Sequence, residues 1–397
     1  MNDAISFEVP WARTDKFDPP SVFASLREER PLARMVYPDG HVGWIVSSYA
    51  LVREVLSDPR FSHSCEIGHF PVTHQGEVIP THPKIPGMFI HMDPPDHTRY
   101  RRLLAGEFTV RRASRLTSRV EAVAAEQIGV MREHGAPVDL VATFAKPLVL
   151  RVLSEMVGLP YAERDRYVHA VALLHDPDAS PEEAAAAYEQ AGAFFDEVIE
   201  RRRKQPEDDL VSRLAADGQL TTEELRNIVT LLLFAGYETT ESALAVGVFA
   251  LLHHADQLAA LRADPAKLNA AVEELLRYLT VNQYHTYRTA LEDLELDGEV
   301  IKKGDSVTVS LPAANRDPAK FECPDRLDIA RDTSGHVAFG FGVHQCLGQN
   351  LARIELRAGL SALFRAFPGL RLAVAADAVP LLLRGSVFAV KNLPVSW

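Results

Sequence analysis

The chain has 397 residues, of which 47% are hydrophobic and 24% charged, and its net charge is −12. This composition is typical of a globular protein with enough apolar residues for a core, and the negative charge argues against general nucleic-acid binding. The three cysteines show no disulfide framework, so we expect a reducing, cytoplasmic environment. Residues 1–20 hold no apolar run of signal-peptide length, and Glu238 and Glu241 interrupt the most apolar run, Thr230 to His253, so we expect neither a signal peptide nor a membrane span.

The first sixty residues alternate between helix and strand signals. They predict a short helix from Pro20 to Glu29, a strand from Gly43 to Val46, and a helix from Tyr49 to Leu56 that stops at Asp58-Pro59. Residues 62–90 carry several prolines and histidines without periodicity. They predict a long loop, and long loops inside compact domains often act as lids.

Histidines in this loop raise the question of a metal site. The candidate ligands are His63, His69, His74 and His82, together with Cys65 and Glu66. No closed set of four ligands is evident in this spacing, because the stretch does not read as helix. We therefore interpret the loop histidines as solvated.

A helix follows at Asp93, with two prolines in its first turn. His97 and Arg101 share one face of it because they lie four residues apart, a pairing that is common on helix surfaces. Residues 111–220 predict a series of amphipathic helices with breaks at Gly135-Ala136-Pro137 and Gly158-Leu159-Pro160.

The next predicted helix is long and crosses the core. It opens at Thr221 with a capping-box pattern and runs to about His253, roughly 45–50 Å at about 1.5 Å per residue. Its apolar stretches have no polar face, yet they enclose Gly236, Glu238 and Thr239. A buried carboxylate is costly without a partner, and a threonine hydroxyl can bend a helix by bonding back to a carbonyl. The alternatives are a ligand site and local strain relief in a long helix.

Two further patterns lie between this helix and the C-terminus. Glu274 and Arg277 have the spacing of an ion pair on any exposed helix. Strands between residues 294 and 311 and a final hairpin near 380–396 supply a small β content.

The most specific stretch is Phe339-Gly340-Phe341-Gly342-Val343-His344-Gln345-Cys346-Leu347-Gly348. A cysteine ends a glycine-containing loop and is followed by a helical apolar pattern, so its thiolate gains from the helix N-terminus. The glycines leave room beside the sulfur. A lone cysteine is usually a small buried hydrophobe. A zinc site is a poor alternative, because Cys65 and Cys323 lack C-x-x-C spacing.

The motif Phe-Gly-x-Gly-x-His-x-Cys-x-Gly resembles the haem-binding loop of the cytochrome P450 superfamily, whose cysteine is an iron ligand. The resemblance covers Ala50 to Trp397 and looks most like soluble actinobacterial members. It implies a mainly α, single-domain fold over residues 1–397, with a small β region and a long core-crossing helix over the haem. This contradicts the two or three domains that length alone suggests.

The resemblance also implies the residues of the site. Cys346 is the expected metal ligand of haem b, and Glu238 and Thr239 are the expected catalytic proton relay. The expected haem contacts are Ile90, His97, Arg101, Ala235, Gly236, Arg288, Phe339, Gly340, His344, Leu347 and Gly348. Among these, His97, Arg101, Arg288 and His344 are expected to hold the propionates, with His336 as a further donor. Glu274 and Arg277 are expected to form a buried pair that supports the cysteine loop.

The implied activity is monooxygenation: O2 cleavage and hydroxylation or epoxidation of an apolar small molecule. Electrons would come from a ferredoxin and its reductase, because the chain has no Gly-x-Gly-x-x-Gly motif and no room for a fused reductase. We expect the ferredoxin to dock near Arg99, Arg102 and Arg353. We expect a monomer with no nucleic-acid or membrane partner. The alternatives are a haem-binding carrier or sensor without oxygenase turnover, a peroxide-driven enzyme, or a xenobiotic-directed monooxygenase.

The substrate pocket is expected to be mainly apolar, with one polar segment. Its expected lining is Met88, Phe89, Phe234, Val281, Asn282, Gln283, His285, Val387 and Phe388. Related enzymes usually have a more apolar, glycine-containing stretch where this chain has Asn282 to His285. In an extended segment about two of these four polar side chains face the pocket. This predicts a secondary metabolite with hydroxyl, carbonyl or sugar groups, such as a macrolide or another polyketide in antibiotic biosynthesis. The alternative is that all four bond only to the protein or to a propionate.

Overall fold

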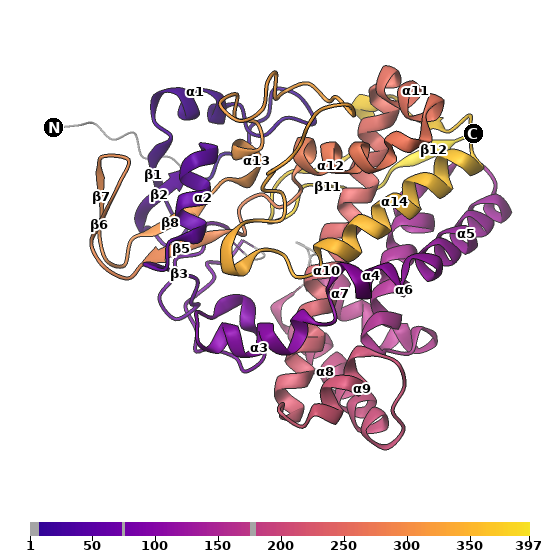
Figure 1. Cartoon of the computed structure of the whole chain (residues 1–397), viewed down its shortest axis with the longest axis horizontal. Helices are drawn as coiled ribbons and strands as arrows, with labels where there is room; N and C mark the ends of the chain where they lie inside the picture. The colour runs from indigo at the N-terminus through magenta and orange to yellow at the C-terminus, as the bar shows by residue number, and fades with distance from the viewer. Residues whose placement is uncertain (1–7, 74–75, 175–179) are drawn as a thin grey trace.

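The structure, a computed structural model, describes residues 8–73, 76–174 and 180–397 and is mainly helical (Figure 1). The α-helices are α1 Val22–Glu29, α2 Tyr49–Ser57, α3 Asp96–Ala105, α4 Val110–Ser114, α5 Thr117–His134, α6 Lys146–Val157, α7 Val168–Leu174, α8 Pro181–Lys204, α9 Leu210–Asp217, α10 Thr222–His253, α11 Ala255–Ala263, α12 Leu268–Leu279, α13 Leu311–Ala314 and α14 Gln349–Ala366. The expected helices at residues 20–29, 49–56 and 222–253 are therefore confirmed.

The strands form small sheets. They are β1 Leu32–Val36, β2 Val42–Val46, β3 Phe61–Ser62, β4 Val138–Asp139, β5 Tyr287–Ala290, β6 Leu294–Leu296, β7 Glu299–Ile301, β8 Ser306–Val309, β9 Arg371–Leu372, β10 Leu381–Leu382, β11 Ala389–Val390 and β12 Pro394–Ser396. The largest sheet has the order β1-β2-β8-β5-β3, in which β2 and β8 are parallel and the other pairs antiparallel. It places β5, and so Arg288, beside the β3 end of the predicted 62–90 loop.

Helix α10 is the axis of the helical part. The Thr221 side chain accepts a hydrogen bond from the Glu224 N–H, and the Glu224 side chain accepts one from the Thr221 N–H, so both halves of the predicted capping box are present. The helix packs against α6, α8 and α14 and passes through the centre of the molecule (Figure 1). Its burial follows from its apolar sequence, which offers no polar face to water.

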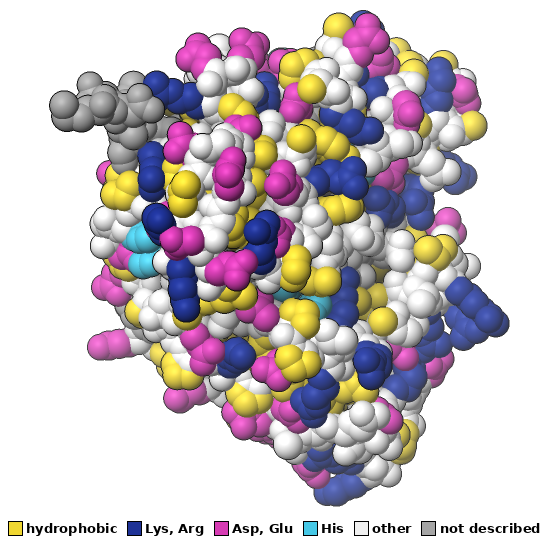
Figure 2. Space-filling model, turned by 60° about the vertical axis from the view of Figure 1, so that its left-hand side comes forward, with side chains coloured by type: hydrophobic (Ala, Val, Ile, Leu, Met, Phe, Trp, Pro, Cys, Tyr) yellow, Lys and Arg dark blue, Asp and Glu magenta, His cyan; other side chains and the backbone are white. Residues whose placement is uncertain are grey.

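The outer surface carries mixed charges, and a membrane span would require a helix of sufficient length and hydropathy. Acidic and basic side chains are interspersed over the face shown in Figure 2. Among the described residues, no single helix is long and apolar enough to cross a membrane, and α10 and α11 pass that test only as a pair bent by 100°.

Candidate functional site

A cavity of about 480 Å³ lies between α10, α3, α14, the cysteine loop and the segment leading into β5. This volume falls within the usual range for ligand sites, about 300–1,000 Å³. Apart from His336, every residue expected to contact haem lines it: Ile90, His97, Arg101, Ala235, Gly236, Arg288, Phe339, Gly340, His344, Leu347 and Gly348. Cys346, Glu238 and Thr239 line it as well, so segments far apart in the sequence meet around one space.

The cysteine loop has the open geometry that its glycines predict. Gly340 and Gly342 adopt positive φ angles of 70° and 76°. A Cβ at Gly342 would collide with the carbonyl oxygen of Leu56, whereas one at Gly340 or Gly348 would meet open space. The Cys346 N–H donates to the Phe339 carbonyl at 2.9 Å, which closes the loop just before α14. The loop therefore leaves free space beside the sulfur.

The thiol of Cys346 is held at the cavity wall in a mixed environment. Burial raises its pKa, while the backbone N–H groups of Gly348 and Gln349 and the guanidinium of Arg101 oppose that rise. The net direction is upward, so the helix start alone does not produce the thiolate that the sequence predicts. A coordinated metal cation would supply the missing stabilisation, because a metal-bound thiol is deprotonated outright.

Four donors of the predicted propionate set converge on one part of the cavity. Arg288 is 3% exposed and donates to the Tyr287 carbonyl at 2.7 Å. Arg101 donates to the Gln345 carbonyl. The rings of His97 and His344 lie 4.2 Å apart, and Nε2 of His97 is buried without a partner.

No carboxylate pairs with Arg101 or Arg288 among the described residues. Burial lowers the pKa of Arg288 to about 10, that of His97 to about 4 and that of His344 to about 2. The two histidines are therefore neutral hydrogen-bond donors, whereas Arg101 and Arg288 remain cations, and a buried cation requires a counter-charge. This cluster therefore fits a bound group that carries two carboxylates, as haem does.

His336 does not join this set, which corrects the expectation of a further propionate donor. Its Nε2 lies 3.0 Å from Oε2 of Glu273, and its Nδ1 accepts from the Ala338 N–H at 3.2 Å. It is not among the residues that line the cavity. The imidazole therefore binds Glu273 on α12 and is not available to a propionate.

The polar residues of α10 face the cavity at its middle. The Thr239 hydroxyl donates to the Ala235 carbonyl at 2.7 Å, the back-bond that a threonine inside a helix makes. Gly236 has a packing reason as well as a cavity position, because a Cβ there would lie 3.0 Å from Cδ2 of Leu153 on α6. The close approach of α6 to α10 therefore accounts for this glycine in addition to its place at the cavity.

The expected substrate residues divide into two groups. Phe89, Phe234, Val281, Asn282, His285 and Val387 line the cavity. Oδ1 of Asn282 is buried there without a hydrogen-bond partner. About half of the polar segment therefore faces the cavity, as expected.

Met88, Gln283 and Phe388 do not line it, which corrects the expectation for these three. The Gln283 amide donates to the Leu383 carbonyl at 3.1 Å and accepts from Nη2 of Arg13 at 2.6 Å. The guanidinium of Arg13 also lies 4.3 Å from the ring centre of Phe388, which is fully buried. The N-terminal segment turns both side chains away from the cavity.

His63 and His91 also line the cavity, although the sequence did not predict either of them as a cavity residue. His63 is only 5% exposed and both of its ring nitrogens lack partners, so the interpretation as a solvated loop histidine is wrong for it. The loop has no periodicity that would reveal this side chain.

The other loop histidines have different surroundings. His69 lies 2.5 Å from Asp39, and the His82 Nδ1 donates to the Pro83 carbonyl at 2.9 Å. His74 lies outside the described residues. No group of three or more His, Cys, Asp or Glu side chains among the described residues is placed to hold a metal ion.

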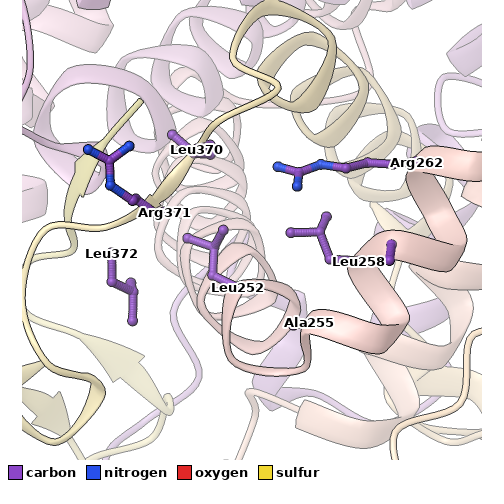
Figure 3. A pocket seen from close by; sticks show the side chains of 8 residues that line it. Leu252, Ala255, Leu258, Arg262, Leu370, Arg371 and Leu372 are labelled. Carbon is purple, nitrogen blue, oxygen red and sulfur yellow. The ribbon is translucent and has the colours of Figure 1, made fainter.

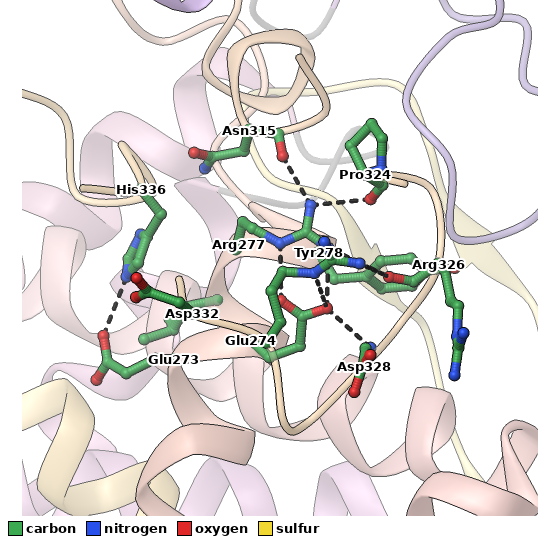
Figure 4. Close-up of polar contacts among 12 residues, drawn as sticks. Glu273, Glu274, Arg277, Tyr278, Asn315, Pro324, Arg326, Asp328, Asp332 and His336 are labelled. Carbon is green, nitrogen blue, oxygen red and sulfur yellow. Dashed lines mark hydrogen bonds and ion pairs between the residues drawn. The ribbon is translucent and has the colours of Figure 1, made fainter. Parts of the chain in front are cut away.

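The predicted Glu274–Arg277 pair is buried, as expected (Figure 4). Both side chains are fully shielded from solvent, and Nε of Arg277 lies 2.7 Å from Oε2 of Glu274. Arg277 also donates to the carbonyls of Asn315 at 2.8 Å and Pro324 at 2.9 Å. Oδ1 of Asn315 in turn accepts from the Val337 N–H at 2.8 Å, just before the cysteine loop.

Together, the mainly helical fold, the cysteine on a glycine loop and the anion-demanding cluster define a protein built around a prosthetic group with two carboxylates. The family model for cytochrome P450 matches residues 168–373. The chain is 44% identical to cytochrome P450 105C1 of a Streptomyces species, covering all of both chains. It is 39% identical to mycinamicin IV hydroxylase/epoxidase of Micromonospora griseorubida, covering 94% of each. The crystal structure of CYP105P1 in complex with filipin I matches with a TM-score of 0.92 and 39% identity over 99% of each chain.

The chain belongs to the cytochrome P450 family. Its cofactor is haem, and it is a monooxygenase. Bacterial members of this family take electrons from redox partners such as a ferredoxin and its reductase, and they bind small-molecule substrates.

Proposed function

We propose that this monooxygenase binds haem iron through Cys346 and hydroxylates or epoxidises a mainly apolar secondary metabolite. The observation that carries the proposal is that Cys346, the four propionate donors and Thr239 all line one cavity. Residues from His63 to Val387 contribute to that cavity, which supports one domain over the whole chain. Haem held by a cysteine thiolate supplies O2 activation, because the thiolate pushes electron density that favours O–O cleavage.

The residues that line the cavity would bind the haem propionates, deliver protons and hold the substrate. Arg101, Arg288, His97 and His344 would anchor the propionates by charge-assisted hydrogen bonds. Thr239 holds a hydroxyl proton at the cavity wall, and with Glu238 it would form the relay that delivers protons to oxygen without opening the site to bulk water. Phe89, Phe234 and Val281 would exclude water and hold an apolar substrate.

Cys346→Ser tests the ligand assignment. The reduced carbon monoxide complex of the wild type should show the thiolate-type spectrum, and the variant should lose it. Cys323→Ser is the matched control, because Cys323 is exposed and does not line the cavity. A thiolate-type spectrum that survives in Cys346→Ser would show that another group holds the iron.

For the substrate, we infer a sizeable apolar molecule that carries hydroxyl or carbonyl groups. The buried, unpartnered Oδ1 of Asn282 supports this, since such an acceptor calls for a donor such as a hydroxyl. One similar protein is named a mycinamicin IV hydroxylase/epoxidase and another, CYP105P1, has a structure in complex with filipin I, which agrees with a substrate of the macrolide or polyketide kind.

A library of such metabolites, screened by the spectral change on displacement of water from the haem, would identify the ligand. Asn282→Ala should then weaken its binding by about tenfold or more, since a lost buried hydrogen-bond partner costs about 1–3 kcal/mol. Unchanged affinity in that variant would remove Asn282 from substrate recognition.

We further infer that an acidic ferredoxin docks near Arg102. The guanidinium of Arg99 is 2.6 Å from Glu224 and that of Arg353 is 2.7 Å from Glu273, so their charges are already balanced. Arg102 is exposed, and no acidic partner pairs with it in the described part of the chain. Arg102→Glu should slow reduction by an acidic ferredoxin at low salt, because complementary charge mainly accelerates encounter. Equal reduction rates for variant and wild type would exclude this docking position.

The family argues against the alternative from the sequence, a haem-binding carrier or sensor without turnover, and a direct assay can test it. Substrate-dependent NAD(P)H consumption with a surrogate ferredoxin and reductase separates the two. A monooxygenase couples that consumption to an oxygenated product, whereas a carrier binds the same ligand and yields none.

A further inference from the structure

A second cavity lies away from the haem site, at the C-terminal end of α10 (Figure 3). It has a volume of about 500 Å³, is open to solvent and shares no lining residue with the haem cavity. It exists because α11 leaves the end of α10 at an angle of 100° and β9 runs past the corner. Its lining comes from α10, α11 and the chain at β9: Leu252, Ala255, Leu258, Ala259, Arg262, Leu370, Arg371 and Leu372.

The floor of this cavity is apolar. Leu258 and Leu370 are buried, with 5% and 3% of their surface exposed, and Leu252 and Leu372 are half-buried. The leucine side chains come from opposite walls (Figure 3). An apolar hollow of this size at the surface is typical of a place where a hydrophobic group binds.

Two arginines flank the leucines, Arg262 on α11 and Arg371 on β9, and both are exposed (Figure 3). Arg371 makes only marginal contacts, at 3.5 Å to the Gly369 carbonyl and 3.4 Å to the Ser396 hydroxyl. The Arg262 guanidinium lies 5.7 Å from the ring centre of Phe364. Neither forms an ion pair within residues 8–73, 76–174 and 180–397.

The two arginines also differ from many others in the chain, because they lie beside an apolar hollow and have no carboxylate partner within the described part of the chain. The chain's net charge is −12, and arginines elsewhere, such as Arg119, Arg213 and Arg353, pair with carboxylates. Two cations without a carboxylate beside an apolar hollow complement a ligand with an aliphatic body and an anionic end. A guanidinium prefers a carboxylate, which it binds with two parallel hydrogen bonds.

We propose that this corner binds a long-chain carboxylate, with the aliphatic chain on the leucine floor and the carboxylate between Arg262 and Arg371. The site is independent of the haem cavity and of what the enzyme oxidises. A long-chain carboxylate bound at this corner would not contact the residues that line the haem cavity.

Dodecanoate is the probe, and dodecanol is its uncharged match. The holoenzyme is first saturated with clotrimazole, an azole that binds haem iron and fills the main cavity, so that dodecanoate is directed to any remaining site. Isothermal titration calorimetry, below the micelle concentration, then counts that site and gives its affinity. The variants are Arg262→Ala, Arg371→Ala and their combination. Arg365→Ala is the control, since Arg365 is an exposed arginine on α14 that does not line the cavity.

We expect one dodecanoate site in the clotrimazole complex, weakened about fivefold by each single substitution and roughly twentyfold by the double one. Dodecanol should bind more weakly than dodecanoate, and Arg365→Ala should bind dodecanoate as the wild type does. Haem content and the carbon monoxide spectrum verify that each variant is folded.

Three results would overturn the proposal. The first is the absence of any dodecanoate site once clotrimazole fills the main cavity. The second is a remaining site whose affinity is the same in the double variant as in the wild type. The third is equal binding of dodecanol and dodecanoate, which would assign the hollow to apolar contact alone.

Discussion

Replacing Arg277 with methionine should destabilise the protein strongly, although the side chain touches neither haem nor substrate. Arg277→Met keeps an unbranched side chain of similar length but leaves Glu274 as a buried carboxylate. Glu274 would retain only the Asp328 N–H, at 2.9 Å, and the Arg331 Nε, at 3.3 Å, while the Asn315 and Pro324 carbonyls lose their donor.

The expected magnitude follows from this burial. Breaking a buried ion pair by removing one partner costs about 3–5 kcal/mol, and each carbonyl left without a donor costs about 1–3 kcal/mol in isolation. These costs overlap, so we expect a loss of about 4 kcal/mol. Domains are typically stable by about 5–15 kcal/mol, so this loss is a large share of the total.

Urea unfolding of variant and wild type measures the loss, and Arg203→Ala is the control. Arg203 and Glu200 form an ion pair with the same i,i+3 spacing on the exposed face of α8. The control should lose no more than about 1 kcal/mol. If Arg277→Met loses as little as Arg203→Ala, burial is not what gives the pair its importance.

A double replacement separates charge from packing. Glu274→Leu combined with Arg277→Met removes the buried carboxylate that only Arg331 would still offset, and apolar replacements of a buried pair are often close to neutral. The double variant should therefore be more stable than Arg277→Met alone. The reverse order would mean that the contacts of Glu274 with Asp328 and Arg331 outweigh the cost of burying its carboxylate without Arg277.

Three other substitutions test separate parts of the molecule. Thr239→Ala should still consume NAD(P)H but release more peroxide and less product, and an unchanged product-to-NAD(P)H ratio would remove Thr239 from the relay. Arg101→Ala with Arg288→Ala should purify with much less haem, measured by the Soret-to-280 nm absorbance ratio, and full occupancy would contradict the propionate assignment. Burial raises the pKa of Glu241 to about 7. Its folded form therefore holds the proton more tightly than the unfolded chain, and this contribution is lost as the pH rises from about 4.5 through 7. Relative to wild type, Glu241→Gln should gain about 2 kcal/mol between pH 5 and pH 8, measured by urea unfolding, whereas parallel pH profiles would show that Glu241 does not titrate in this range.

The parts of the site that the sequence predicts correctly are contiguous or periodic. The glycine loop before Cys346 and the α10 segment around Thr239 each carry their geometry locally, through positive φ angles and a back-bond. The capping box at Thr221 is likewise read from four residues. Local patterns of this kind survive folding because the contacts that produce them lie within a turn or two of chain.

The errors fall where a distant partner decides the direction of a side chain. Arg13 holds Gln283 away from the cavity across 270 residues of sequence, while Asn282 next to it faces the cavity. Glu273 captures His336 in the same manner across 63 residues. No periodicity in an irregular segment encodes such a choice.

The buried polar groups at the cavity wall explain why the fold and the cofactor belong together. Arg288, 3% exposed, donates a hydrogen bond to the Tyr287 carbonyl, and His97 and His63 hold buried ring nitrogens without partners. Each is costly to bury on its own, and one bound dicarboxylate satisfies several of them at once. A ligand that binds only the folded chain raises its stability by mass action, so haem acts here as part of the core. The Arg277 network supports the cysteine loop from the protein side. Arg277 binds the Asn315 carbonyl, and the Asn315 side chain binds the Val337 N–H, where the cysteine loop starts. Stability and iron ligation therefore depend on separate residues that converge on one loop.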